Sequence, residues 1–126
     1  MVAAETNVLV RLIVQDDSVQ LNKAKQFIQT GVWASHLVLA EAIWVLRSAY
    51  GADKAEQVRA VEMLLGTAMV TLEDAPVVEA ALAQFVHHAK PSFTDCLVLE
   101  IARKVGHTPL GTFDKALGKL PGTKTL

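Results

Sequence analysis

Four acidic side chains, Glu5, Glu41, Asp95 and Asp114, stand where carboxylates could do chemistry together. Glu5 closes a short apolar run, Asp95 opens an apolar helical pattern, and Asp114 directly follows the run PLGTF. Carboxylates brought together repel one another unless a cation holds them. Oxygen ligands suit a hard divalent ion, Mg²⁺ or Mn²⁺. Such an ion orients water and stabilises charge during phosphodiester cleavage, so the acids alone predict a metal-dependent nuclease.

Glu41 has the most unusual surroundings of the four. In LVLAEAIWVL its helical neighbours three and four residues away are all apolar, namely Leu37, Val38, Trp44 and Val45. A solvated helix face is not normally built in this way, and an unpaired Glu is rarely buried. The pattern therefore predicts that Glu41 points into a cavity on the packed side of its helix.

The remaining nine of the 13 acidic residues have ordinary structural explanations. Some stand at helix starts, where an acid caps free N–H groups, and others lie on amphipathic helices or end a strand. Helix starts account for Asp16, Asp17, Asp53 and Asp74, while Glu73 ends a strand. Glu100 precedes Lys104 by four residues, which predicts a surface ion pair.

Short apolar runs alternate with helical patterns along the chain. We predict strands at VAA before Glu5 and at 32–38, 68–73 and 108–113, with a weak fifth at the terminal TKTL. Capping residues and glycines delimit helices over 17–31, 39–51, 52–66, 74–89 and 94–106. This alternation favours a parallel sheet covered on both faces. Sites in such folds form beyond the carboxyl ends of the strands, where the four acids are expected to converge.

Composition is typical of a single globular domain over residues 1–126. The chain has 52% hydrophobic and 20% charged residues, a net charge of -1 and one cysteine, Cys96. The charge provides no global positive field, so any binding of nucleic acid must be local. No run of about 18 uncharged apolar residues predicts a membrane span, and the start has no signal-like segment, so we expect a cytoplasmic protein.

Four segments resemble, in order, the successive motifs of PIN-domain ribonucleases, specifically the VapC-type toxins of bacterial toxin–antitoxin pairs. They are ETNVLVRLIVQDD, LAEAIWVLRSAYG, FTDCLVLEIARKVG and TFDKALGKLPG. The resemblance covers nearly the whole chain. It implies an α/β fold, a PIN-like three-layer α/β/α sandwich around a short parallel sheet. It also implies Mg²⁺- or Mn²⁺-dependent RNA cleavage, a homodimer, and a VapB-type antitoxin that blocks the site.

The family's acidic metal site maps onto Glu5, Glu41, Asp95 and Asp114, which the resemblance makes both catalytic residues and metal ligands. Asn7 and Thr112 are the expected supporting polar groups, and Arg11, Arg47 and Lys115 are candidate RNA contacts. The first acid of the family is usually Asp, whereas this chain has Glu5. The extra methylene displaces the carboxylate by about one C–C bond length, which backbone movement, another rotamer or a water must absorb.

Other classes fit less well. A phospho-acceptor receiver domain needs an acidic pair after its first strand, and a haloacid-dehalogenase-type phosphatase needs Asp-x-Asp there, whereas the chain has Glu5-Thr6-Asn7. The remaining alternative is a PIN-fold protein whose catalysis is weakened or lost through Glu5, and which serves as an RNA- or protein-binding regulator. Metal-dependent RNA cleavage distinguishes the two readings.

Overall fold

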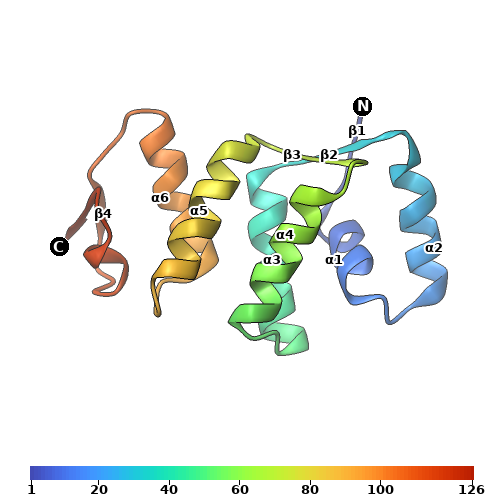
Figure 1. The fold of residues 1–126 in the computed structure, drawn as a ribbon, viewed down its shortest axis with the longest axis horizontal. Coiled ribbons are helices and arrows are strands. Elements are labelled where there is room, and N and C mark those ends of the chain that lie inside the picture. The colour runs from blue at the N-terminus through green and yellow to red at the C-terminus, as the bar shows by residue number, and fades with distance from the viewer. The chain divides into compact units, whose positions relative to one another are not determined.

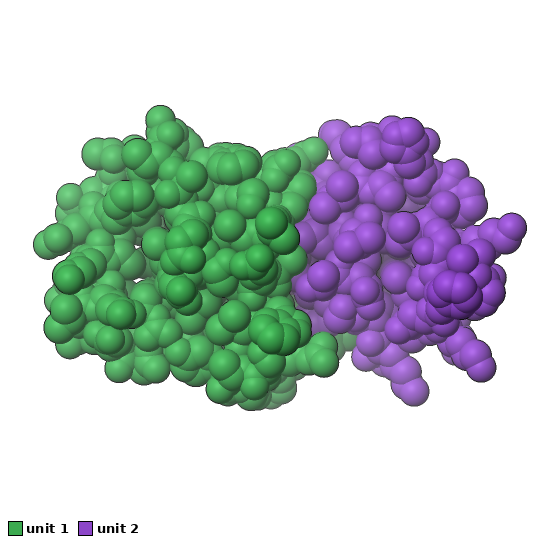
Figure 2. Space-filling model, turned by 180° about the vertical axis from the view of Figure 1, so that it is seen from behind, with its two compact units in different colours: residues 1–75 green, residues 76–126 purple.

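Two compact units make up the chain in a computed structural model that describes residues 1–126. Unit 1 is Met1–Ala75 and unit 2 is Pro76–Leu126, coloured separately in Figure 2. The boundary falls in the first turn of helix α5 (Ala75–His87). Each unit has its own small parallel sheet and its own buried apolar side chains. That residues 1–126 form a single domain stays a prediction.

Unit 1 contains a three-stranded parallel sheet in the order β1-β2-β3. The strands are β1 (Val2–Ala3), β2 (Val32–Ala34) and β3 (Val70–Leu72). Val32 lies opposite Val2 on one side and Val70 on the other. The first three predicted strands are confirmed, each shorter than its apolar run. Figure 1 shows these strands together, with the helices of unit 1 extending to one side of them.

Four helices belong to unit 1, and local caps explain where most of them begin. They are α1 (Thr6–Val14), α2 (Ser18–Phe27), α3 (His36–Tyr50) and α4 (Lys54–Gly66), with a 3₁₀ turn η1 (Ile28–Thr30) after α2. The side chain of Asp17 caps α2, and Asp53 forms a capping box with Glu56 on α4. The predicted helices 17–31, 39–51 and 52–66 are confirmed. Helix α3 begins three residues before the prediction because Ser35 caps it.

The core of unit 1 consists of aliphatic side chains from α1, α3, α4 and the sheet. Completely or almost completely buried are Leu9, Val10, Val32, Ala34, Leu39, Ala42, Ile43, Val61 and Leu64. Full burial of each of the valine, leucine and isoleucine side chains stabilises the fold by about 1.5–3 kcal/mol. This core fixes α1, which begins beside Glu5, and α3, which carries Glu41.

Unit 2 contains α5, α6 (Phe93–Lys104) and a two-stranded parallel sheet of β4 (Leu110–Thr112) and β5 (Thr123–Thr125). A 3₁₀ turn, η2 (Leu117–Lys119), lies between these strands. The rings of Phe85 and Phe93 meet edge to face with centroids 6.0 Å apart. Cys96 is completely buried in this core. The predicted helices 74–89 and 94–106, and both C-terminal strands, are confirmed.

Arg103 connects α6 to the segment before β5. Its Nε donates to both carboxylate oxygens of Glu100, at 3.3 and 3.0 Å, and its Nη2 donates to the carbonyl oxygen of Pro121 at 2.7 Å. The prediction that Glu100 lies at the surface is wrong, because Glu100 is only 7% exposed, and its carboxylate forms an ion pair with Arg103. A buried carboxylate needs such a partner.

No helix has the length and apolar character needed to cross a lipid bilayer. Six helices and five short parallel strands confirm the predicted α/β class.

Candidate functional site

Glu5 is the N-cap of α1. Its backbone is extended, and its Oε1 accepts a 3.0 Å hydrogen bond from the backbone N–H of Asn7. An acid at this position satisfies one of the free N–H groups of the helix and suits the positive end of the helix dipole. Its other oxygen makes no hydrogen bond within the chain, so the carboxylate keeps one oxygen available to a ligand.

Thr6 joins Glu41 to the start of α1. Its hydroxyl donates a 2.8 Å hydrogen bond to Oε2 of Glu41, on α3. Thr6 is 9% exposed, and its side chain occupies the first position of the helix that Glu5 caps. Of these two adjacent residues, Glu5 provides one candidate carboxylate and Thr6 holds a second, that of Glu41. No role for Thr6 was predicted from the sequence, although a threonine beside a candidate ligand is a usable signal.

Glu41 lies on an exposed face of α3, which corrects the prediction that it points into a cavity on the packed side. The apolar neighbours Leu37 and Trp44 are 68% and 61% exposed. The buried side of α3 consists instead of Leu39, Ala42, Ile43 and Leu46. Helix α3 has apolar side chains on nearly all of its faces, so the sequence alone could not identify which face packs against the core.

Two side chains fix the N-terminus of α3. Ser35 caps it by accepting from the N–H of Val38 at 3.1 Å, and Oε1 of Glu73 accepts from the N–H of His36 at 2.9 Å. Glu73 directly follows β3, so it fixes the first turn of α3 from a neighbouring strand. The prediction that Glu73 merely ends a strand missed this contact. The contact sets the start of the helix that carries Glu41.

Asp95 lies in the first turn of α6 in unit 2, and it is not the cap. Ser92 is the N-cap, with its hydroxyl oxygen accepting from the N–H of Asp95 at 3.1 Å. The side chain of Asp95 is half-buried. An ordinary capping role therefore does not explain this carboxylate. Its position near a helix N-terminus suits negative charge.

Asp114 follows β4 in unit 2 and closes the turn into η2. Its Oδ1 accepts from the N–H of Leu117 at 2.9 Å, and its own N–H donates to the hydroxyl oxygen of Thr112 at 2.9 Å. One carboxylate oxygen thus has the local turn role that Asp often has. The other makes no hydrogen bond within the chain. Thr112 orients the backbone that presents Asp114.

The structure brings Glu5 and Glu41 to one junction in unit 1, while Asp95 and Asp114 belong to unit 2. No group of three His, Cys, Asp or Glu side chains lies close enough together to hold a metal ion. The convergence of all four acids therefore stays a prediction.

Of the three candidate RNA contacts, Arg11 already forms hydrogen bonds and an ion pair within the chain, whereas Arg47 and Lys115 form no ion pair. The guanidinium of Arg11 donates to Asp16 at 2.8 Å and to the hydroxyl of Tyr50, and the Tyr50 hydrogen bond raises the pKa of Arg11 above its usual value. Arg47 and Lys115 are exposed, and no ion pair engages them. The two exposed cations are thus free to meet phosphate, whereas Arg11 is held within unit 1.

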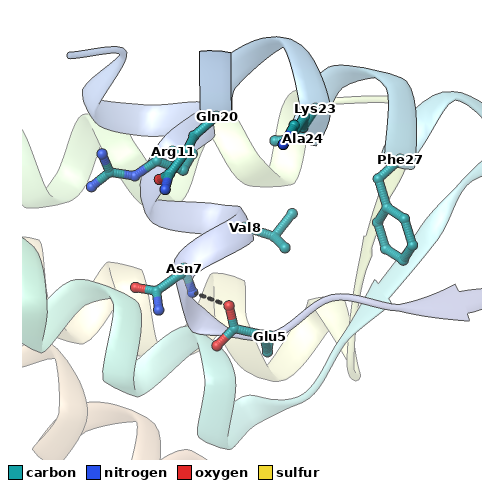
Figure 3. A pocket seen from close by; sticks show the side chains of 8 residues that line it. All are labelled: Glu5, Asn7, Val8, Arg11, Gln20, Lys23, Ala24 and Phe27. Carbon is teal, nitrogen blue, oxygen red and sulfur yellow. Dashed lines mark hydrogen bonds between the residues drawn. The ribbon is translucent and has the colours of Figure 1, made fainter. Parts of the chain in front are cut away.

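A hollow of about 370 Å³ opens beside Glu5 between α1 and α2; we call it the α1–α2 hollow. It is lined by Glu5, Asn7, Val8, Arg11, Gln20, Lys23, Ala24 and Phe27 (Figure 3). In Figure 3, Glu5 lies at the start of α1 and Phe27 at the end of α2, with Val8 between them. The α1–α2 hollow was not predicted from the sequence, because neither Lys23 nor Phe27 belongs to an acidic motif.

Comparisons with known proteins support the family suggested by the sequence. No match was found among curated protein sequences. One solved structure similar to the chain is that of VapC20 from Mycobacterium tuberculosis, a toxin that cleaves the sarcin-ricin loop. It is 22% identical, with a TM-score of 0.44, over 99% of this chain and 98% of the toxin. The PIN domain family matches residues 2–122, and the chain therefore belongs to the PIN domain family.

Proposed function

We propose that this protein is a Mg²⁺- or Mn²⁺-dependent endoribonuclease that acts as the VapC-type toxin of a type II toxin–antitoxin pair. The observation that carries the proposal is the family match over residues 2–122, which includes all four candidate carboxylates, Glu5, Glu41, Asp95 and Asp114. The junction of Glu5, Thr6 and Glu41 supports it, because two candidate ligands are held at one helix start.

The carboxylates of unit 1 fit the proposed cation in their chemistry. Glu5 and Glu41 each commit one oxygen to a hydrogen bond and keep the other free. Hard carboxylate oxygens are the ligands that Mg²⁺ and Mn²⁺ take. Asp95 and Asp114 would complete the ligand set. When bound, the ion would supply positive charge at the scissile phosphate and lower the pKa of a water.

The neighbouring polar groups would hold these carboxylates in place. The Thr6 hydroxyl restrains Glu41, and the N–H of Asn7 restrains Glu5. Thr112 and the turn at Leu117 restrain Asp114. Positioned ligands matter because catalysis falls steeply when reacting groups move by even about 1 Å.

The proposed metal-dependent RNA cleavage is tested most directly by a substitution at Glu41. We expect the purified protein to hydrolyse RNA only with Mg²⁺ or Mn²⁺, and Glu41→Gln to lower the rate at least about a hundredfold. Glutamine can still accept the Thr6 hydrogen bond, so the fold of unit 1 should remain. Glu62→Gln, at an exposed position of α4, is a matched control that removes the same charge. Equal cleavage by Glu41→Gln and the parent, with contaminating nuclease excluded, would refute the site assignment.

The second candidate function is a PIN-fold regulator with weak or lost catalysis, which binds RNA or protein. The observation that favours it is Glu5 in place of the usual aspartate. Its oxygen already serves as a helix cap, which restricts how far the carboxylate can move toward an ion. Tight RNA binding by a parent protein that shows no metal-dependent cleavage would favour this function.

The proposal includes a cytoplasmic protein, a VapB-type antitoxin and a homodimer. Leu37 and Trp44 form an exposed apolar strip on α3 and flank Glu41, so a second copy that packs on this strip would border the proposed metal site without covering Glu41. The antitoxin is tested by searching for a short reading frame next to this gene and co-expressing it, since its product should bind the protein and relieve growth arrest. Growth arrest that persists despite co-purification of the two proteins would contradict inhibition by that partner.

A further inference from the structure

The α1–α2 hollow combines three kinds of group in one place. Phe27 provides an aromatic ring that is 46% exposed, and Val8 and Ala24 provide apolar wall. Gln20 and Asn7 provide side-chain amides, and Lys23 provides a cation. An aromatic ring, a hydrogen-bonding amide and a cation are respectively suited to the base, the base edge and the phosphate of a nucleotide.

Lys23 is the free cation of the hollow. Its exposed ammonium takes part in no ion pair, whereas Arg11 is held by Asp16 and Tyr50. In Figure 3 the Arg11 guanidinium points away from Val8 and Phe27, while Lys23 stands on α2 above the space between the helices. Because the chain has a net charge of -1, attraction of a phosphate must come from such local cations.

The position of Glu5 connects the hollow to the proposed cleavage site. Glu5 lines the hollow and is also a candidate metal ligand. A chain of nucleotides whose scissile phosphate lies beside Glu5 must continue on at least one side. A volume of about 370 Å³ is within the range of small-ligand sites.

From these observations we propose that the α1–α2 hollow binds one nucleotide of single-stranded RNA next to the scissile phosphate. The base stacks on Phe27, Lys23 pairs with a phosphate, and Gln20 contacts the base edge. The inference rests on the proposed ribonuclease function and adds a determinant of which RNA is bound. Double-stranded RNA is excluded as the ligand, because a paired base cannot turn onto an aromatic ring.

The test measures binding of a fluorescent single-stranded RNA to the full chain in EDTA, and metal-dependent cleavage separately. We expect Phe27→Leu to weaken binding about tenfold and Phe27→Tyr to keep it, because stacking needs a ring. Lys23→Ala should weaken binding and reduce the slope of log affinity against log salt by about 0.7, the value for one phosphate contact on a single strand. Lys25→Ala removes the same charge from α2 outside the hollow and should change neither quantity.

The outcomes separate this inference from the proposed function. Weaker binding and an altered cleavage-site preference in Phe27→Leu, without a change in Tm, would support the nucleotide subsite. Parent-like RNA binding, salt slope and cleavage in Phe27→Leu and Lys23→Ala would overturn the subsite and leave the ribonuclease proposal standing. If those variants lost only inhibition by the antitoxin, the hollow would belong to the protein partner and the inference would be wrong. A parent that neither binds nor cleaves RNA would overturn both.

Discussion

The Thr6 hydroxyl donates a 2.8 Å hydrogen bond to Oε2 of Glu41, and this bond joins the first turn of α1 to the middle of α3. Residues 35 positions apart in the chain are thereby fixed relative to each other. The same turn of α1 is capped by Glu5, so a single helix start organises two of the four candidate ligands.

Thr6→Val should therefore separate positioning from ligand binding. Valine keeps the shape but removes the hydroxyl, so Glu41 loses its partner while its charge remains. We expect about 1 kcal/mol lower stability in urea unfolding and about tenfold slower RNA cleavage. Thr6→Ser keeps the hydroxyl and should retain most of the activity. A Thr6→Val rate equal to that of the parent would show that this bond does not position Glu41 for cleavage.

Glu5 variants should reveal whether the backbone has adapted to the longer side chain. Glu5→Asp keeps a good helix cap but shortens the carboxylate, so we expect metal affinity and cleavage to drop while the Tm is kept. Glu5→Ala removes ligand and cap together and should also cost about 1 kcal/mol of stability. Paired titrations of Mg²⁺ affinity and cleavage rate check this. Faster cleavage by Glu5→Asp would mean that the longer side chain misplaces the cation.

Removing Arg103 should destabilise unit 2 through the buried carboxylate that it leaves behind. Arg103 also approaches Gly122, which has a φ of 89°, and it donates to the carbonyl of Pro121. We expect Arg103→Ala to lower stability by about 1–2 kcal/mol, reduced from the value of a fully buried pair because Arg103 is 41% exposed. The double variant Glu100→Leu/Arg103→Ala should recover part of the loss, as thermal unfolding can measure. An equal loss in the single and double variants would argue against this cause.

The exposed strip of α3 should control self-association. Sedimentation velocity at micromolar concentration is expected to give a dimer for the parent, and a monomer for Trp44→Arg because a charge would replace the largest apolar side chain of the strip. Val19→Arg is the control, since Val19 is 63% exposed but lies on α2. A parent that sediments only as a monomer would contradict the homodimer.

Most elements of the fold could be predicted from the sequence, because local signals determine them. Asp17 and Asp53 cap the helices that their positions predicted, and alternating apolar runs located the strands. Helix α1 was not among the helices predicted from the sequence pattern, because its apolar part, residues 8–14, is short and only Arg11 interrupts it. Apolar runs this short do not distinguish helix from strand by period.

The candidate site could be predicted in its residue types but not in its contacts. Glu41 was singled out for the wrong reason, since its apolar neighbours Leu37 and Trp44 are exposed rather than packed. Thr6 and Glu73 make contacts with residues more than 30 positions away, and no local pattern encodes such pairs. Asp95 was placed near a helix start, yet only the structure revealed that Ser92 has the capping role.

The hydrogen bond from the His36 amide to Glu73 has a consequence for the dynamics of the protein. That amide exchanges its proton with solvent only when its hydrogen bond to the carboxylate opens, either by rotation of the Glu73 side chain or by movement of the end of β3. Deuterium uptake at His36 therefore reports opening of this contact between the end of β3 and the first turn of α3, at a position five residues before Glu41. Transient fraying of a three-residue strand would then loosen the helix that presents a candidate ligand, long before global unfolding.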